Sequence, residues 1–211
     1  MNIKTKIAAA TAAIGLLSAA GAAGAAEIAV AGVTASSTFF TYNVNHLIDG
    51  SGLVGGGLHD GDFHDKWMGD IFVLPTLVFD LGATYSLTSS SIWNYNGGCC
   101  GDTRSVNGLT ISFSNDNVGY VSAGNFNLSH TAADPFGSDS LGLTGNARYV
   151  KFDITSNYGD DYTGLSEVKF FGGAATGGVP EPATWAFMLV GFGGLGAVLR
   201  RRRSVAAVAA A

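Results

Sequence analysis

The sequence predicts an all-β domain, an antiparallel β-sandwich or jelly roll, between two targeting segments. Apolar and polar residues of the central region alternate with a period of two, which is typical of half-buried strands. Clusters of Gly, Asn, Asp and Ser separate these stretches. No stretch of the central region shows convincing helical periodicity. Many short strands without helical crossovers favour two packed antiparallel sheets.

Five stretches of the central region are predicted as strands. The alternation is clearest in the third and fourth, where apolar side chains occupy every second position. Turn-forming residues at 49–52, 55–57 and 114–117 separate parts of this pattern. In chain order, the predicted strands are 77–81, 92–95, 109–114, 149–154 and 168–170.

The first 26 residues are predicted to be a secretory signal peptide. Lys4 and Lys6 precede an apolar stretch at 7–20, and small residues precede Glu27, which is the layout of a cleaved leader. An Ala-rich helix of the folded domain is the alternative, but no polar face recurs at helical spacing. Cleavage after Ala26 leaves residues 27–174 as one domain, long enough for a sizeable core.

The C-terminal region has the pattern of a single membrane span. The apolar run 183–199 has 17 residues, close to the lower limit of roughly 17–25 for a spanning helix. The arginines that follow favour a cytoplasmic location for the tail, 200–211. A linker, 175–182, precedes the run and contains Pro180, Glu181 and Pro182.

This ending resembles the PEP-CTERM sorting signal of Gram-negative bacteria. The resemblance implies processing by an exosortase near Pro-Glu-Pro, transient anchoring in the inner membrane, and delivery to the cell envelope or extracellular matrix. A plain membrane anchor, or a Gly-rich core helix with a solvated basic tail, is the alternative. The matching elements are Pro180, Glu181 and Pro182, Trp-Ala at 185–186, Gly-Phe-Gly at 191–193, and Arg200, Arg201, Arg202 and Arg203.

The domain between the targeting segments is strongly acidic. The whole chain has a formal charge of −5, but residues 27–174 carry five basic side chains against fifteen acidic ones. Such a domain repels phosphate backbones, so nucleic acid is not an expected partner. Acidic polysaccharides would need a divalent cation as a bridge.

The only two cysteines, Cys99 and Cys100, are adjacent. Thiols tend to pair in an oxidising compartment, and neighbours can pair only through a strained ring, so we expect a vicinal disulfide. Such a bond would stiffen a loop but would hardly restrict the unfolded chain, because the loop that it closes is so short. Two reduced or intermolecularly linked cysteines are the alternative.

Eight short motifs, in order, resemble the discoidin-like domain, also called the coagulation factor 5/8 type C or galactose-binding-like domain. The resemblance implies an eight-stranded β-sandwich jelly roll that serves mostly as a binding module, including many bacterial carbohydrate-binding modules. The terminal disulfide common in animal members has no counterpart here. The motifs lie at 34–37, 47–50, 66–67, 78–82, 92–95, 114–116, 147–150 and 165–168.

The same resemblance implies a structural calcium ion between Asp49 and Glu167. Calcium takes six to eight oxygen ligands, so backbone carbonyl groups, such as those of Leu47 and Ser51, would complete the shell. The alternative is that Asp49 caps a turn and Glu167 is a solvated strand residue.

Residues 59–65, His-Asp-Gly-Asp-Phe-His-Asp, suggest a second metal hypothesis. Imidazole and carboxylate groups at alternate positions could converge on a transition metal. A solvated loop of polar turn formers explains the segment as well and is the preferred interpretation. The loop could also contact a ligand, because binding residues are common on loops of a rigid scaffold.

Loop aromatics and polar groups are the candidates for sugar contact. An aromatic ring can lie against a pyranose face while polar side chains bind its hydroxyl groups. Trp67 and Trp93 fall at the buried positions of the family and are expected in the core. The candidate ligand-binding residues are Phe63, Tyr95, Arg104, Tyr158 and Tyr162, with Asn96 and Asp102 beside the cysteines.

These observations predict a non-catalytic, surface-sorted module that binds a polysaccharide or other glycan of the envelope or matrix. Acidic residues, serines and histidines are present, but none lies in a recognisable catalytic motif. The main alternative is a structural extracellular-matrix or biofilm protein without a specific ligand. A glycan-active enzyme with an unrecognised site is a third possibility.

Overall fold

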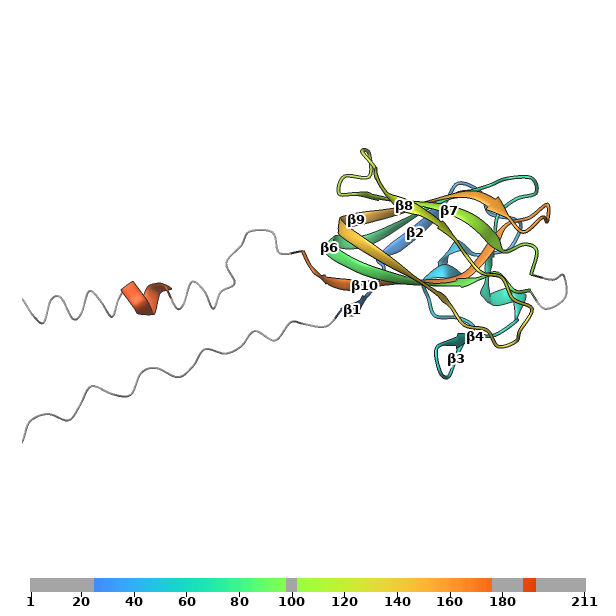
Figure 1. Cartoon of the computed structure of the whole chain (residues 1–211), viewed down its shortest axis with the longest axis horizontal. Helices are drawn as coiled ribbons and strands as arrows, with labels where there is room; N and C mark the ends of the chain where they lie inside the picture. Colours follow the sequence, from blue (N-terminus) through green and yellow to red (C-terminus); the bar gives the residue numbers. More distant parts are fainter. Residues whose placement is uncertain (1–24, 98–101, 176–187, 193–211) are drawn as a thin grey trace, which may run out of the picture. The chain divides into compact units, whose positions relative to one another are not determined.

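The computed structural model describes residues 25–97, 102–175 and 188–192 of the 211-residue chain (Figure 1). The chain divides into two compact units, 1–175 and 176–211. The first contains the whole hydrophobic core cluster, so it has the core that a domain needs to fold alone. The second is described only at 188–192, which are helical. No helix within the described ranges is both long and apolar enough for a membrane span.

The described part of the first unit is all-β, as predicted, with ten strands and two short 3₁₀ helices. The strands are β1 (Ala26–Ile28), β2 (Gly32–Ala35), β3 (Leu53–Val54), β4 (Leu58–His59), β5 (Trp67–Met68), β6 (Thr76–Asn94), β7 (Val106–Ser114), β8 (Val121–Asn127), β9 (Asp139–Asn157) and β10 (Gly164–Ala174). The helices are η1 (Val44–Leu47) and η2 (Phe63–Asp65).

Strands β6 and β9 are long enough to take part in two layers. The first part of β6 pairs with β2 and with the last part of β9, which also pairs with β7. The second part of β6 pairs with β10 and with the first part of β9. The β6–β9 register shifts between Asp80 and Tyr85, where the strands pass from one layer to the other. One layer is therefore β2-β6-β9-β7-β8, and the other is β1-β10-β6-β9 with β5 on β10.

Aromatic side chains from both layers meet in the core. The rings of Phe79 and Phe152 come from the first layer and that of Phe170 from the second, with centroids 5.0 to 6.0 Å apart. All three are fully buried, as aromatic core residues of packed sheets are. Trp67 and Trp93 are also buried, so their predicted place in the core is confirmed.

The strand predictions succeeded where the alternation was clear. Three of them, 109–114, 149–154 and 168–170, lie in β7, β9 and β10. Two others, 77–81 and 92–95, fall in the single strand β6, which ends at Asn94, because the Ser- and Thr-rich residues between them also pair with β9 and β10. Strands β1 to β5 and β8 were not predicted. Strand β8 contains Gly124 and two asparagines, which are uncommon in strands, and it lies at the end of the sheet order.

Candidate functional site

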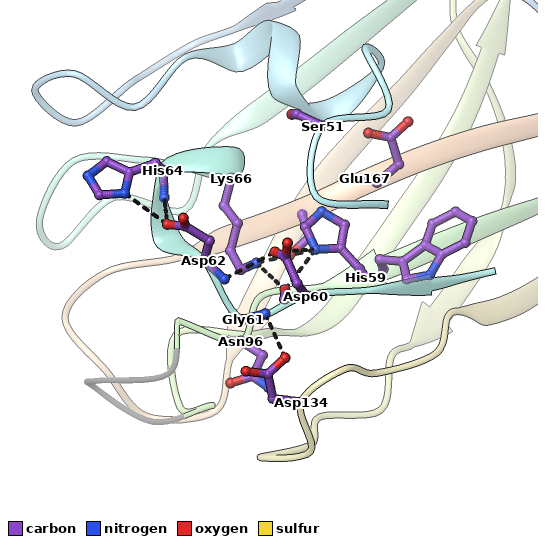
Figure 2. Close-up of polar contacts among 12 residues, drawn as sticks. Ser51, His59, Asp60, Gly61, Asp62, His64, Lys66, Asn96, Asp134 and Glu167 are labelled. Atoms are coloured by element: carbon purple, nitrogen blue, oxygen red, sulfur yellow. Dashed lines mark hydrogen bonds and ion pairs between the residues drawn. The ribbon is translucent and has the colours of Figure 1, made fainter. Parts of the chain in front are cut away.

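Four loops are joined at one end of the sandwich, which we call the loop end. The Gly61 amide donates a hydrogen bond to Asp134 Oδ1 at 2.9 Å (Figure 2), and the Asn96 side-chain amide donates to the Ala133 carbonyl. Each bond connects two different loops, so the loops support one another on the rigid sandwich. The loops of the loop end are 59–66, 95–105, 128–136 and 158–163, without residues 98–101, which the structure does not describe.

Arg104 connects two of these loops. Its Nε lies 3.5 Å from Asp160 Oδ1, and its guanidinium carbon lies 5.0 Å from the centroid of the Tyr162 ring. The Tyr162 ring packs edge-on against Phe39, with centroids 4.9 Å apart. The side chain of Arg104 is 18% exposed, so the cation is held in place but still reaches the surface. A guanidinium has five N–H donors, and Nη1 of Arg104 also lies 3.9 Å from Met68 Sδ.

Tyr158 lies beside His130 at the loop end. Their ring centroids are 3.8 Å apart, and the Tyr158 hydroxyl donates to the Leu128 carbonyl at 2.7 Å. His130 Nδ1 lies 2.5 Å from Asp102 Oδ2, and the His130 side chain is 40% exposed. Aromatic surface, imidazole and carboxylate groups thus lie side by side, which is the combination that a sugar ring and its hydroxyl groups require. His130 was not among the predicted site residues.

The prediction that Tyr95 contacts a ligand is wrong. Tyr95 directly follows β6 and is 2% exposed. A Cβ at Gly97 or Gly164 would collide with its side chain, so the backbone of two neighbouring segments covers the ring. Burial raises the pKa of the Tyr95 hydroxyl. Tyr95 instead packs in the interior beneath the loop end. Its backbone carbonyl accepts a hydrogen bond from Ser105 Oγ at 2.5 Å.

Phe63 is at the surface, as predicted, but on a different loop from Arg104. It lies in η2, is 41% exposed, and its ring centroid is 3.9 Å from that of His64. Of the five candidate ligand residues, the structure therefore brings Arg104, Tyr158 and Tyr162 onto two joined loops and leaves Phe63 at a neighbouring one.

An apolar rim lies beside Tyr162, and sequence reasoning missed it. Phe40 and Phe72 are 86% and 77% exposed and have left-handed backbones, with φ of 46° and 61°. The Phe72 amide donates to the Asp161 carbonyl at 2.8 Å, which places the rim next to the Tyr162 loop. Bulky side chains rarely adopt this conformation, and such strain is common at binding sites. The apolar rim consists of Phe40, Ile71, Phe72, Val73 and Leu74.

Asp49 and Glu167, the predicted calcium ligands, lie next to the same turn. Glu167 Oε2 accepts a hydrogen bond from the Gly50 amide at 3.3 Å, and Asp49 Oδ1 accepts one from the Ser51 amide at 2.9 Å. Glu167 is 1% exposed, so the alternative of a solvated strand residue is wrong. Burial, with a smaller contribution from Asp49, raises the pKa of Glu167 to about 8.

The oxygen atoms at this turn have the chemistry that a hard cation requires of its ligands. A buried carboxylate is costly unless it is paired, and the Ser51 hydroxyl is buried without a hydrogen-bond partner. Both features favour an oxygen-binding cation at the turn. No group of three or more His, Cys, Asp or Glu side chains in the described residues forms a metal site. A calcium ion would therefore depend on Asp49, Glu167 and backbone carbonyl groups.

The segment 59–65 does not form the second metal site. His59 is fully buried, whereas the side chain of His64 is 72% exposed and bonds Asp62 (Figure 2). Lys66 is also fully buried, and its Nζ donates to the Asp60 carbonyl at 2.7 Å and lies 3.3 Å from His59 Nδ1. Burial lowers the pKa of His59 and lowers that of Lys66 to about 8. The ammonium group of Lys66 thus lies beside His59, where a metal ion would have to bind. The preferred interpretation of a solvated loop is wrong for the buried residue His59.

Several predicted features fall on residues that the structure does not describe. They are Cys99 and Cys100, residues 1–24 of the predicted leader, the Pro-Glu-Pro segment, Arg200 to Arg203, and most of the predicted membrane span. The structure does not test any of them, so they stay predictions. Strand β1 begins at Ala26, the last residue of the predicted leader.

Comparison with known proteins supports both resemblances. Residues 178–203 match the PEP-CTERM protein-sorting motif. No curated protein sequence matches the chain. One similar solved structure is CpGH89CBM32-5 from Clostridium perfringens in complex with GalNAc-β-1,3-galactose (TM-score 0.54, 12% identity, 69% of this chain and 99% of that chain).

Two further solved structures share the fold. One is the family 32 carbohydrate-binding module of C. perfringens NanJ with galactose (TM-score 0.52, 13% identity, 70% and 98% of the two chains). The other is the lectin domain of lectinolysin with Lewis B antigen (TM-score 0.50, 20% identity, 68% and 93%). At these identities the likeness establishes the fold. The described domain therefore shares the β-sandwich fold of these solved structures, and residues 178–203 of the chain carry a PEP-CTERM protein-sorting motif.

Proposed function

We propose that the domain is a non-catalytic module that binds a glycan of the cell envelope or extracellular matrix at the loop end. The observation that carries this proposal is the convergence of Arg104, Tyr158 and Tyr162 on two joined loops of the sandwich. The amide of Tyr158 donates to the Ser105 carbonyl, one residue from Arg104, at 3.1 Å. Structures of the same fold in complex with galactose and with Lewis B antigen support the ligand class.

Recognition would rest on a rigid scaffold. The ring of Tyr158 or Tyr162 would lie against the apolar face of a sugar, while Arg104 donates hydrogen bonds to its hydroxyl groups. Asp102 and His130 add an acceptor and a second polar group beside Tyr158. Because hydrogen bonds and ion pairs already hold these side chains, little freedom would be lost on binding.

Calcium would stabilise the turn next to the last strand. Asp49, Glu167 and carbonyl groups such as those of Leu47 and Ser51 would hold it. The ion would neutralise two carboxylates and connect the turn to β10, which begins at the loop end. Its role would be structural, because Glu167 is buried.

The match of residues 178–203 to the PEP-CTERM protein-sorting motif supports export and sorting to the envelope of a Gram-negative bacterium. In this proposal the leader 1–26 directs export, and the segment 183–199 holds the chain in the inner membrane with the tail 200–211 in the cytoplasm. An exosortase then processes the chain near Pro180, Glu181 and Pro182. The vicinal disulfide of Cys99 and Cys100 would stiffen the loop that precedes Arg104.

The proposal is tested on a glycan array that includes bacterial exopolysaccharides, with calcium and with chelator. Arg104→Ala and Tyr158→Ala should each weaken specific binding about tenfold or more, since each removes a direct ligand contact. Arg148→Ala is the matched control, because Arg148 also has an aspartate partner, Asp80, and a tyrosine ring beside it. Equal losses in all three variants, or no binding by folded protein, would contradict the proposal.

A structural matrix protein is the second candidate, and the apolar rim favours it. Five large apolar side chains on the surface of a secreted domain suit self-association as well as ligand contact. Sedimentation at micromolar concentration distinguishes the two candidates. Self-association that Phe72→Ser abolishes, together with no detectable binding on the glycan array, would support the structural matrix protein.

A further inference from the structure

A groove crosses the outer face of the first layer, on strands β7, β8 and β9. Its volume is about 370 Å³, within the range of roughly 300–1,000 Å³ that is common for ligand sites. None of the residues that surround it belongs to the loop-end site or to the calcium turn. The side chains and backbone that matter for its chemistry are Gly108, Thr110, Asn125, Asn127, Thr155 and Ser156.

An irregularity of the sheet accounts for the groove. The register between β7 and β9 shifts on both sides of Gly108, so Thr155 has no partner on β7. A Cβ at Gly108 would lie 2.5 Å from Thr155 Oγ1 and 2.8 Å from Ser156 Oγ, so a larger residue would force these hydroxyl groups to move. The floor of the groove at Gly108 is therefore backbone, and its walls are short polar side chains of three strands together with Leu109 and Phe126.

The walls carry no charge, although the domain is strongly acidic. Thr110 Oγ1 donates to Asn125 Oδ1 at 2.7 Å, which leaves the exposed Asn125 amide N–H groups for a ligand. The Gly108 amide donates to Ser156 Oγ at 2.9 Å, so the Ser156 hydroxyl hydrogen can point elsewhere. The Asn127 side-chain amide donates to Asn107 Oδ1 at 3.2 Å, which fixes its orientation.

An array of neutral amides and hydroxyl groups, oriented by internal hydrogen bonds, suits a ligand that offers alternating donors and acceptors. The hydroxyl groups of an uncharged sugar do so. The groove is open to solvent along the free side of β8, the last strand of the sheet order, so a chain could continue past it. We infer that this groove is a second carbohydrate site, which binds a short stretch of an uncharged polysaccharide independently of the loop end.

The test is an NMR titration of the ¹⁵N-labelled domain, residues 25–175, with millimolar malto-, cello-, laminari-, xylo- and mannohexaose, and with hexaguluronate as the charged comparison. The reporters are the side-chain amides of Asn107, Asn125 and Asn127 and the backbone amide of Gly108. At least one neutral hexasaccharide should shift them in a saturable way, and hexaguluronate should not. The double variant Asn125→Ala, Asn127→Ala should weaken this binding at least about tenfold, because it removes two oriented amides.

Two control variants separate the groove from the loop end. Ser122→Ala alters an exposed side chain of the same strand outside the groove and should leave the shifts unchanged. Arg104→Ala should leave the groove shifts unchanged even where it abolishes binding at the loop end. Absence of saturable groove shifts with every neutral hexasaccharide, or shifts that persist in the double variant, would overturn the inference while leaving the loop-end proposal intact.

Discussion

The domain contains two sets of ionisable side chains of the same three kinds, one set buried and the other partly exposed to solvent. Each set has one basic side chain, one imidazole and one carboxylate. The first set is almost completely buried, and burial shifts the pKa of every member. The second reaches the surface at the loop end. The buried set is Lys66, His59 and Glu167, and the exposed set is Arg104, His130 and Asp102. Burial couples the first set to folding, whereas exposure leaves the second available to a ligand.

Truncation of Lys66 should have the largest effect on stability. Lys66→Ala removes a fully buried side chain and leaves the Asp60 carbonyl without its donor, so we expect a loss of roughly 2–4 kcal/mol in the free energy of unfolding. The matched Lys151→Ala removes a surface ion pair with Asp153 and should cost less than about 1 kcal/mol. Urea denaturation measures both, and equal losses would remove the distinction between buried and exposed lysines.

Removal of calcium should have the next largest effect. At a calcium concentration about 100 times the Kd, binding stabilises by about 2.7 kcal/mol, so chelation should lower the Tm by about 5–10 °C. Glu167→Gln should make the Tm insensitive to chelator, whereas Glu27→Gln, which alters an exposed carboxylate paired with Lys169, should not. An unchanged Tm of the unaltered domain on chelation would remove calcium from the proposed function.

The metal-free domain should lose a stabilising contribution from Glu167 as the pH rises. The pKa of Glu167 is raised from 4.5 to about 8, so folding favours the protonated carboxyl group. This contribution is fully present below pH 4.5 and is lost as the pH rises through 8. Unfolding free energies of the unaltered domain and Glu167→Gln should diverge across this window, by at most about 1.4 kcal/mol per pH unit. Parallel pH profiles would contradict a buried, protonated Glu167.

The smallest effect on stability is expected from the exposed set. Arg104→Ala should change the free energy of unfolding by about 1 kcal/mol or less, because its ion pair with Asp160 is partly solvated. Arg104→Lys should retain the charge but lose the planar donor geometry, and glycan affinity should fall about tenfold. Thermal melts and titrations with the array ligand check both expectations. Full affinity in Arg104→Lys would show that charge alone suffices.

The sequence predicted the scaffold well because period-two alternation reports directly on burial. Strands β7 and β9 were recognised in this way. The same rule would have placed Tyr95 correctly, since it lies two positions after Trp93 and both are buried. The preference for a loop contact came from the Asn and Gly residues that follow Tyr95, and the backbone that covers its ring comes from distant positions such as Gly164.

The buried polar residues could not be predicted because their neighbours are far away in the sequence. Segment 59–66 has the composition of a solvated loop, yet Phe136, 70 positions beyond Lys66, packs over its ammonium group at 5.4 Å. His130 was missed for the same reason, because the ring beside it, Tyr158, belongs to another loop. The vicinal disulfide, the leader and the membrane span stay predictions.

Strand β10 determines how far the proposed glycan site lies from the C-terminal end of the domain. The Gly164 amide donates to the Arg104 carbonyl at 2.9 Å, so the strand begins at the loop end, and it continues for 11 residues to Ala174. At about 3.3 Å per residue it spans roughly 35 Å. The loop end and Ala174 therefore lie at opposite ends of this strand. A domain attached through its C-terminal side would have the proposed glycan site at the end away from the attachment point.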